Sequence, residues 1–396
     1  MNATYAMCML KRAAATALRR LARHYPVIAV TGPRQSGKTT LARVTFPRKP
    51  YASLEELDIR EFAERDPRGF LGQFRSGAVL DEAQRAPGLF SYLQSSVDRD
   101  RAPGRFVLTG SQQFGLFSGI TQTLAGRVGL IHLLPFTLGE LGGGSAPPTV
   151  EHLLWQGLYP PVIDRRIPPG TWYADYIATY VERDVRQLIN VRDLGAFRRF
   201  VRMCAARTAQ LLNLSSLAAD CGITHNTAKA WISVLEASYI VHVVPPYHRN
   251  FGKRLIKAPK LYFLDTGLAG ALAGIREAGE LAIHPMRGAL FETWVIAELL
   301  KHRLNRGQPA DIHFWRNSGG SEVDAVVERG ARLHALEVKS GRTIAADYLA
   351  GLERFSRIAA IATASLVYAG DEGQRRSQAT IFGWREIGAA AKRLLG

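Results

Sequence analysis

The stretch Gly32-Pro33-Arg34-Gln35-Ser36-Gly37-Lys38-Thr39 follows directly after the apolar run Val27-Ile28-Ala29-Val30 and decides the fold of the first part of the chain. A strand, a glycine-containing loop and a Lys-Thr pair match the phosphate-binding pattern G-x-x-x-x-G-K-[ST]. Glycine lets backbone amides close around an anion, Lys38 can reach the β- and γ-phosphates, and the hydroxyl of Thr39 can ligate magnesium. The pattern predicts a site for ATP and Mg²⁺, with an ordinary glycine turn as the alternative. The residues predicted to bind the nucleotide are Gly32, Pro33, Arg34, Gln35, Ser36, Gly37, Lys38, Thr39 and Thr40.

A second acidic motif is expected on a neighbouring strand, and Ala78-Val79-Leu80-Asp81-Glu82 has the required form. Asp81 is predicted to hold magnesium, together with Thr39, and Glu82 to polarise the attacking water. A small-molecule kinase must exclude water and has no need of such a glutamate, so Glu82 indicates a hydrolase. Phosphoryl transfer to a small molecule is therefore the weaker alternative.

Two further polar positions follow the next strand, Phe106-Val107-Leu108. Ser111 is the candidate that senses the γ-phosphate, with Thr109 as the alternative. Arg127 is a candidate arginine finger or sensor of transition-state charge. The alternative for Arg127 is an ordinary surface arginine.

The order of these motifs resembles a known family. GPRQSGKT (32–39), LDEAQ (80–84), LTGSQQF (108–114), LAGRV (124–128) and LLPFTLGEL (133–141) are similar to the motifs of prokaryotic AAA-type ATPases that carry a C-terminal domain of unknown function. The resemblance extends over almost the whole chain. It implies an AAA+-like P-loop site that uses Lys38, Thr39, Asp81 and Glu82. An arginine finger acting in trans would require a neighbouring subunit, so a homo-oligomer is a candidate assembly.

The composition is that of a globular protein with a large positive charge. The 396 residues are 47% hydrophobic and 21% charged, and the formal net charge is +17. Such an excess favours a polyanionic partner such as nucleic acid, with DNA preferred, although a biased composition rich in arginine is the alternative. Cys8, Cys204 and Cys221 show no metal or disulfide spacing, which favours a cytoplasmic location.

No stretch is apolar enough to predict a membrane span or a membrane partner. Residues 1–54 contain no acid and superficially resemble a transit peptide. Because this run continues into the P-loop, we expect instead a helix from about Lys11 to Arg23.

Three α/β or helical domains are expected. They are a P-loop domain with a parallel sheet at 1–141, a helical region with a winged helix at 151–275, and a restriction-endonuclease-like α/β domain at 286–396, with a linker after the first. Within the middle region, two helices separated by Gly222, the second capped by Thr224, have the pattern of a helix-turn-helix. Extended segments at 240–244 and 261–264 would flank a wing. Five basic residues concentrate in or beside it: Arg249, Lys253, Arg254, Lys257 and Lys260. They favour DNA contact, with a protein-contact module as the alternative.

The C-terminal part predicts a hairpin that gathers acidic residues. If Arg329-Gly330 is the two-residue turn, residue 324 opposes 335, and residues 335, 337 and 339 share its face. Asp324 and Glu337 would then be diagonal neighbours that bind magnesium, with Lys339 stabilising the transition state of phosphodiester cleavage. Glu292, from the preceding helix, would complete the metal site.

The spacing D-x12-E-V-K resembles the PD-(D/E)XK nuclease superfamily, although Val323 stands where the fullest pattern has proline. This resemblance implies a Mg²⁺-dependent nuclease module, and an ordinary surface hairpin is the alternative. The leading interpretation is an ATP-hydrolysing, nucleic-acid-associated protein with such a module. The competing one is a non-catalytic nucleotide-dependent switch or scaffold with an inactive nuclease-like fold.

Overall fold

The computed structural model describes residues 10–110, 123–142, 146–185, 193–247 and 257–396. The chain divides into two compact units. Unit 1 consists of residues 1–136, 237–239 and 303–309, and unit 2 contains the remaining residues. Among the described helices, none is long and apolar enough to cross a membrane.

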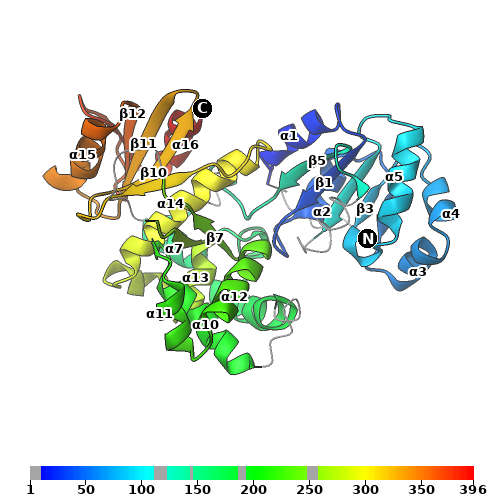
Figure 1. Ribbon diagram of the computed structural model, residues 1–396, viewed down its shortest axis with the longest axis horizontal. Helices are drawn as coiled ribbons and strands as arrows, with labels where there is room; N and C mark the ends of the chain where they lie inside the picture. The colour runs from blue at the N-terminus through cyan, green and yellow to red at the C-terminus, as the bar shows by residue number, and fades with distance from the viewer. Residues whose placement is uncertain (1–9, 111–122, 143–145, 186–192, 248–256) are drawn as a thin grey trace, which may run out of the picture. The chain divides into compact units, whose positions relative to one another are not determined.

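Unit 1 is built on a five-stranded sheet in the order β2-β3-β4-β1-β5, with every described pair of strands parallel (Figure 1). The predicted parallel sheet is therefore confirmed. The strands are β1 (Val27–Thr31), β2 (Tyr51–Ser53), β3 (Val79–Asp81), β4 (Phe106–Gly110) and β5 (Val128–His132). The helices are α1 (Ala14–Leu21), α2 (Lys38–Thr45), α3 (Leu57–Arg65), α4 (Pro67–Gly72) and α5 (Leu89–Arg99).

Strand β1, which lies between β4 and β5, is buried along its whole length, because helices cover both faces of the sheet. One core contains Phe70, Phe90 and Leu93, and the other contains Leu18, Leu41 and Ala42. Since all strands run in one direction, the carboxyl ends of β1, β3 and β4 meet at one edge. Ligands of open parallel sheets bind at that edge.

Unit 2 begins with a helical segment that packs around aromatic side chains. It contains α7 (Val150–Gln156), α8 (Pro160–Ile163), α9 (Pro169–Tyr176) and a π-helical continuation at Ile177–Val185. Trp172, Tyr176, Tyr180 and Val181 share a buried face, as the helical spacing predicts. Tyr173 donates a hydrogen bond to the carboxylate of Asp265 (2.6 Å), which fixes this segment to the chain that follows.

The middle of unit 2 has the order helix, strand, helix, helix, strand, strand. The elements are α10 (Leu194–Ala206), β6 (Gln210–Leu211), α11 (Leu214–Cys221), α12 (His225–Ala237), β7 (Val241–Val244) and β8 (Lys260–Phe263), followed by α13 (Thr266–Leu272). The three strands form an antiparallel sheet in the order β6-β8-β7. Gly222 adopts φ 68° at the end of α11, and Thr224 accepts a hydrogen bond from the amide of Thr227 (3.1 Å). Both turn features were predicted.

The predicted basic cluster of this segment is only partly described. Arg249, Lys253 and Arg254 lie outside the described residues. Lys257 is exposed, whereas Lys260 is 3% exposed. Including Lys260 in a surface cluster was therefore wrong, because its side chain points into the protein toward carboxylates.

The last part of unit 2 is a six-stranded mixed sheet in the order β13-β14-β12-β11-β10-β9, preceded by the long helix α14 (Arg287–Leu304). The strands are β9 (His313–Arg316), β10 (Glu322–Arg329), β11 (Arg332–Lys339), β12 (Ile361–Tyr368), β13 (Gln374–Arg375) and β14 (Thr380–Gly383). Helices α15 (Ala350–Ile358) and α16 (Ile387–Leu395) lie on opposite faces of this sheet (Figure 1).

The predicted hairpin forms, but its turn was misplaced. Arg329 pairs with Arg332 and Val326 with Ala335, so the two turn residues are Gly330 and Ala331. The pairing shifts by two positions, which keeps every side chain on its predicted face. Continued along the strands, this register puts Asp324 directly opposite Glu337 instead of diagonal to it. Gly330 adopts φ 61°, a conformation that glycine tolerates better than Arg329 would.

Candidate active site

The P-loop connects the carboxyl end of β1 to the first residue of α2. Gly37 adopts φ 88° and Gly32 φ 148°, and a side chain at Gly32 would overlap the carbonyl oxygen of Leu133. Gln35 also has a positive φ, 64°, which is uncommon for a residue with a side chain. The loop thus depends on glycine where the motif requires it.

Lys38 is buried at the base of this loop. Its Nζ donates hydrogen bonds to the carbonyl oxygens of Pro33 (2.7 Å) and Gly32 (3.1 Å). Burial lowers the pKa of Lys38 to about 8, although Glu82 and Asp81 act in the opposite direction. The charged form of this lysine is therefore poorly solvated by the protein alone, which suits a group that pairs with phosphate.

Asp81 is the centre of a hydrogen-bond cluster at the end of β3. The hydroxyl of Thr39 donates to its Oδ1 (2.8 Å), Tyr51 donates to its Oδ2 (2.9 Å), and Thr109 also contacts Oδ1. The structure therefore brings together the two residues predicted to hold magnesium. Hydroxyl and carboxylate oxygens are the ligands that Mg²⁺ prefers, so the donor set fits this ion.

Of the two residues predicted to sense the γ-phosphate, Thr109 is described by the structure and Ser111 is not. Ser111 lies outside the described residues. Thr109, the alternative, lies at the end of β4 and contacts Asp81. Tyr51 was missed, because it lies on a short strand that carries no recognisable motif. Partial burial and the contact with Asp81 raise the pKa of Tyr51 to about 12.

Glu82 follows Asp81 in a left-handed conformation, φ 51°. Such a conformation is costly for a residue other than glycine and occurs most often at functional sites. The side chain is half-buried, and its Oε2 accepts a hydrogen bond from Gln84. The backbone turn places Glu82 at the same edge of the sheet as the P-loop.

Arg12 supports the site from α1's amino-terminal side, a contact that sequence reasoning missed. It donates hydrogen bonds to the carbonyl oxygens of Ser36 (2.7 Å) and Leu134 (2.6 Å). The arginine thereby holds the P-loop against the segment that follows β5. No motif marks it, because it lies 24 residues before Ser36.

Thr31, the last residue before the P-loop, makes buried contacts that were also missed. Its hydroxyl lies 2.7 Å from the hydroxyl of Tyr239 and 2.8 Å from Nδ1 of His132. Burial lowers the pKa of His132 to about 4, so the imidazole is neutral at ordinary pH. Tyr239 follows α12 in the chain and belongs to residues 237–239 of unit 1. Its contact with Thr31 is therefore made within unit 1.

The remaining P-loop residues differ in how exposed they are to solvent. Pro33 and Ser36 are buried, Arg34 is half-buried, and Gln35 and Thr40 are exposed. Thr40 lies in the first turn of α2.

Arg127 is placed away from this site. It precedes β5, and its carbonyl accepts a hydrogen bond from Val27 at the amino end of β1 (3.2 Å). The five residues of β1 separate this edge from the P-loop by roughly 16 Å at about 3.3 Å per residue. Its guanidinium donates to both carboxylate oxygens of Asp98 (2.6 and 2.9 Å). A sensor role within the same chain's site was therefore wrong, and a role toward a neighbouring subunit stays a prediction.

Unit 2 contains a second cluster of acids, from α14 and β10. Carboxylate oxygens of Glu292, Glu322 and Asp324 lie within 4.8 Å of one another. The ammonium of Lys260 lies among them, 2.7 Å from Glu292, 3.7 Å from Asp324 and in direct contact with Glu322. Glu322 was missed as a member of this cluster, although it lies two residues before Asp324 on β10, a spacing that puts both side chains on one face of the strand.

Glu337 and Lys339 lie next to this cluster on β11. Lys339 donates a hydrogen bond to Oε1 of Glu337 (2.6 Å), while the buried Oε2 of Glu337 has no hydrogen-bond partner. Asp324 accepts a hydrogen bond from the amide of Val338 (2.8 Å). Burial, with Glu292 and Glu337 nearby, raises the pKa of Asp324 well above its usual range.

The predicted magnesium ligands of unit 2 thus lie together, but the buried ammonium of Lys260 already lies among them. A divalent ion placed between Glu292 and Asp324 would face the ammonium of Lys260 at close range. A metal ion could therefore bind these residues only if the ammonium of Lys260 moved away, because like charges repel strongly in a buried site.

Comparisons with known proteins agree with a P-loop ATPase domain in the first part of the chain. A family model described as "AAA domain" matches residues 24–142. Two models described as domains of unknown function, DUF8612 and DUF4143, match residues 148–279 and 287–387. The protein Rv2008c of Mycobacterium tuberculosis and the protein Mb2031c of Mycobacterium bovis, both called uncharacterized, are each 33% identical over 341 residues, covering 85% of this chain and 76% of theirs.

The chain belongs to the family of these two mycobacterial proteins. Its first part is an AAA-type P-loop ATPase domain, and the resemblance to AAA-type ATPases is confirmed to that extent. The C-terminal match carries no known function, so the nuclease resemblance stays a prediction.

Solved structures add a distant likeness only. The Walker-type ATPase PABY2304 of Pyrococcus abyssi is 14% identical, with a TM-score of 0.43 over 65% of this chain and 94% of that one. The RuvB Holliday junction branch migration motor of Thermotoga maritima is 18% identical, with a TM-score of 0.27 over 59% and 87%. Similarity this low transfers no property to the present chain.

Proposed function

We propose that this protein hydrolyses ATP at the P-loop and uses the reaction to control an association with nucleic acid. The observation that carries the first half is the hydrogen bond between Thr39 and Asp81, the two residues proposed to hold magnesium. Hydrolysis, as opposed to binding alone, is supported by Glu82, which follows Asp81 at the end of β3 and acts on the pKa of Lys38.

Each residue has a distinct task in this proposal. The P-loop amides and Lys38 bind the β- and γ-phosphates, and Thr39 and Asp81 hold Mg²⁺, which neutralises phosphate charge when bound. Thr109 and Tyr51 keep the Asp81 carboxylate in one orientation through their hydroxyls. Glu82 orients the attacking water and accepts its proton.

The association with nucleic acid rests on the middle of unit 2 and on charge. The order of α10, β6, α11, α12, β7 and β8 supports the winged helix predicted from the sequence, a fold in which the last of the three helices would enter the major groove. The formal charge of +17 supports attraction to a polyanion. DNA is the favoured partner, and a protein-contact role for the same fold is the alternative.

The substitution Glu82→Gln tests the hydrolytic half directly. We expect Mg-ATP affinity within about threefold of the parent and turnover lowered by about 10²-fold or more, since general-base catalysis contributes on that order. Steady-state phosphate release and nucleotide binding by calorimetry measure the two quantities.

The matched control is Glu61→Gln, which removes the same charge from an exposed glutamate of α3 that pairs with Arg65. Its turnover should equal that of the parent. Hydrolysis by Glu82→Gln at the parent rate would show that the base lies elsewhere, and a parent without turnover would favour the non-catalytic switch.

A second candidate function is Mg²⁺-dependent phosphodiester cleavage by the C-terminal part of unit 2. The register that sets Asp324 opposite Glu337, with Lys339 beside it, favours this activity. Lys260 favours the alternative, a nuclease-like fold that does not cut, because its ammonium already lies among the acids. Assays of the parent for nicking of DNA and RNA, with Glu337→Ala as the negative control, distinguish the two.

A further inference from the structure

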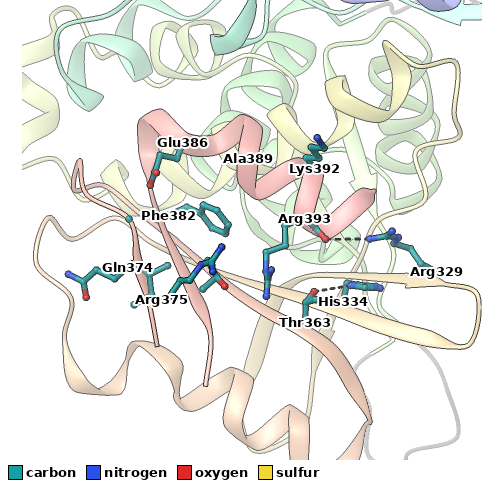
Figure 2. Close-up of a pocket in the computed structure, with 13 residues that line it drawn as sticks. Arg329, His334, Thr363, Gln374, Arg375, Phe382, Glu386, Ala389, Lys392 and Arg393 are labelled. Carbon is teal, nitrogen blue, oxygen red and sulfur yellow. Dashed lines mark hydrogen bonds between the residues drawn. The ribbon is translucent and has the colours of Figure 1, made fainter. Parts of the chain in front are cut away.

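A basic pocket lies between the C-terminal sheet and α16 (Figure 2). Its volume is about 720 Å³, and it is lined by 13 residues. The lining comes from the five adjacent strands β13, β14, β12, β11 and β10 and from α16 with the short turn before it. The size falls in the range of about 300–1,000 Å³ that is usual for small-molecule sites.

Positive charges converge on this pocket from three elements. Arg329 comes from the end of β10, Arg375 from β13, and Lys392 and Arg393 from the last turns of α16. Figure 2 shows Arg375 and Arg393 near the centre of the lining residues, with Arg329 and Lys392 farther to the right. All four residues are exposed, so their charged groups are accessible to a ligand.

Negative charge does not balance them. Glu386 is the only acid among the lining residues, and its Oε2 accepts a hydrogen bond from the amide of Gly383 (2.9 Å). Within the described part of the chain, no carboxylate forms an ion pair with Arg375, Lys392 or Arg393. Arg329 donates a hydrogen bond to the carbonyl oxygen of Arg393 (3.4 Å) and lies next to Gly396.

Two of the lining residues, on neighbouring strands, are polar and contact each other. His334 is buried, and its Nδ1 lies 2.8 Å from the hydroxyl of Thr363 on the neighbouring strand. Burial and the charges of Arg329, Arg332 and Arg393 lower the pKa of His334, in agreement with a positive potential there.

This pocket is separate from the acidic cluster. Leu333 and Ala335 pack against Leu352 and Phe355 of α15, so Glu337 points to the same side as they do. His334 lies between Leu333 and Ala335 in sequence and therefore points to the other side, toward α16. The sheet itself divides the two sites.

We propose that this pocket is an anion site that binds phosphate groups. Arginine side chains bind phosphate by paired hydrogen bonds, and Arg375 and Arg393 are placed to do so from two sides, with Lys392 as a further charge. The proposal goes beyond ATP hydrolysis, because it lies in unit 2 and uses none of the P-loop residues. A free phosphorylated molecule and the backbone of a nucleic acid offer the same chemistry, and the experiment separates them.

The test uses the full chain carrying Lys38→Ala, which weakens phosphate binding at the P-loop. The pocket variant adds Arg375→Gln and Arg393→Gln. Two probes are titrated: inorganic pyrophosphate by calorimetry, and a fluorescent single-stranded oligothymidylate of 20 nucleotides by anisotropy. We expect the pocket variant to lose about tenfold or more in affinity for at least one probe. For the oligonucleotide, the slope of log K against log salt should become less steep by about 0.7 for each charge removed.

The matched control replaces Arg165 and Arg357, two exposed arginines outside the pocket, with glutamine and so has the same net charge. A loss confined to the pocket variant supports the proposal; loss for pyrophosphate assigns a free phosphorylated ligand, and loss for the oligonucleotide alone assigns nucleic acid. Equal affinities of the pocket and control variants, or a parent that binds neither probe, would overturn it. ATP turnover, measured with Lys38 intact, should be unchanged by the pocket substitutions, so failure of the ATPase proposal is seen independently.

Discussion

At the residue scale, Lys38 shows how the P-loop prepares for its ligand. The side chain is enclosed by the protein, and the carbonyl oxygens of Gly32 and Pro33 replace part of its hydration. They replace it incompletely, which is why burial lowers its pKa to about 8. A triphosphate supplies the missing negative charge, so binding should restore the preference of Lys38 for its proton.

This pKa predicts a pH dependence of nucleotide binding. Above pH 8 the free protein increasingly holds a neutral Lys38, which must gain a proton to bind Mg-ATP. We expect affinity to fall as pH rises from 8 to 9.5, by up to about tenfold per unit. Calorimetry at pH 8.5 in two buffers of different ionisation enthalpy should reveal proton uptake, which should vanish near pH 6.5 and in Lys38→Ala. Equal affinity at pH 7 and 9.5 without proton uptake would contradict the assignment.

The same shift has a defined effect on the stability of the nucleotide-free protein. An unfolded Lys38 keeps its proton up to its ordinary pKa near 10.5, whereas the folded one loses it above about 8. Between these values the unfolded state binds more protons, so this residue makes the folded state more stable as pH rises. Below pH 8 its burial costs stability in full.

At the scale of elements, the positions of the strand ends determine which functional residues lie close together. The carboxyl ends of β1, β3 and β4 collect the P-loop, Asp81 and Thr109 at one edge of a parallel sheet. In unit 2, β8 directs Lys260 toward acids that belong to α14 and β10. One buried lysine thereby connects three elements that are far apart in the sequence.

Replacing Lys260 should leave the neighbouring carboxylates without their positively charged partner. Lys260→Met leaves Glu292, Glu322 and Asp324 without their cation, and loss of one partner from a buried ion pair costs about 3–5 kcal/mol of folding free energy. We expect the melting temperature to fall in metal-free buffer and to recover with millimolar Mn²⁺ or Mg²⁺, because a divalent ion can then take the place of the ammonium.

The control is Lys301→Met, which breaks another buried pair, with Glu298 at 3.1 Å. It should be destabilised without recovery by divalent ions. If Mn²⁺ stabilises both variants equally, or neither, Lys260 does not stand in for a metal. Nicking activity that appears only in Lys260→Met would show that the lysine suppresses cleavage.

At the scale of the whole molecule, the nucleotide site belongs entirely to unit 1. Its described residues extend from Arg12 to His132 and include Tyr239. A ligand that binds only the folded form of this unit stabilises it by RT ln(1 + [L]/Kd). The stabilisation should therefore appear in the unfolding of unit 1.

Mg-ATP at about 100 times its Kd should add about 2.7 kcal/mol to the unfolding free energy of unit 1. Scanning calorimetry should show that the transition containing unit 1 moves to higher temperature. The shift should disappear in Lys38→Ala, while ADP without magnesium should give a smaller one. If Mg-ATP did not raise the temperature of any unfolding transition of the parent protein, the assignment of a nucleotide-binding P-loop would be contradicted.

Features that depend on residues close together in the sequence could be predicted reliably. The P-loop is one continuous stretch, and its backbone needs glycine at Gly32 and Gly37, so its identity and position could be predicted. The acids after β3 and the helices on either side of Gly222 were predicted for the same reason. In each case the residues that determine the feature are neighbours in the chain.

Contacts between distant segments could not be predicted in this way. Tyr51, Arg12 and Tyr239 reach the P-loop region from strands and segments that carry no motif. The hairpin turn was displaced by one residue because Arg329-Gly330 and Gly330-Ala331 satisfy similar turn preferences. Arg127 looked like a site residue by its order in the chain, yet β5 puts it at the opposite edge of the sheet.

By itself, the sequence determined that this chain has a P-loop ATPase domain, because phosphate binding requires specific residue types at fixed short spacing. Only the tertiary structure decided that Tyr51 and Thr109 contact Asp81 beside Thr39, that Lys260 lies among the acids of unit 2, and that four basic residues surround a pocket beside α16. These outcomes depend on strand order, register and the direction of individual side chains. Those properties arise from packing between distant segments, which no local pattern encodes.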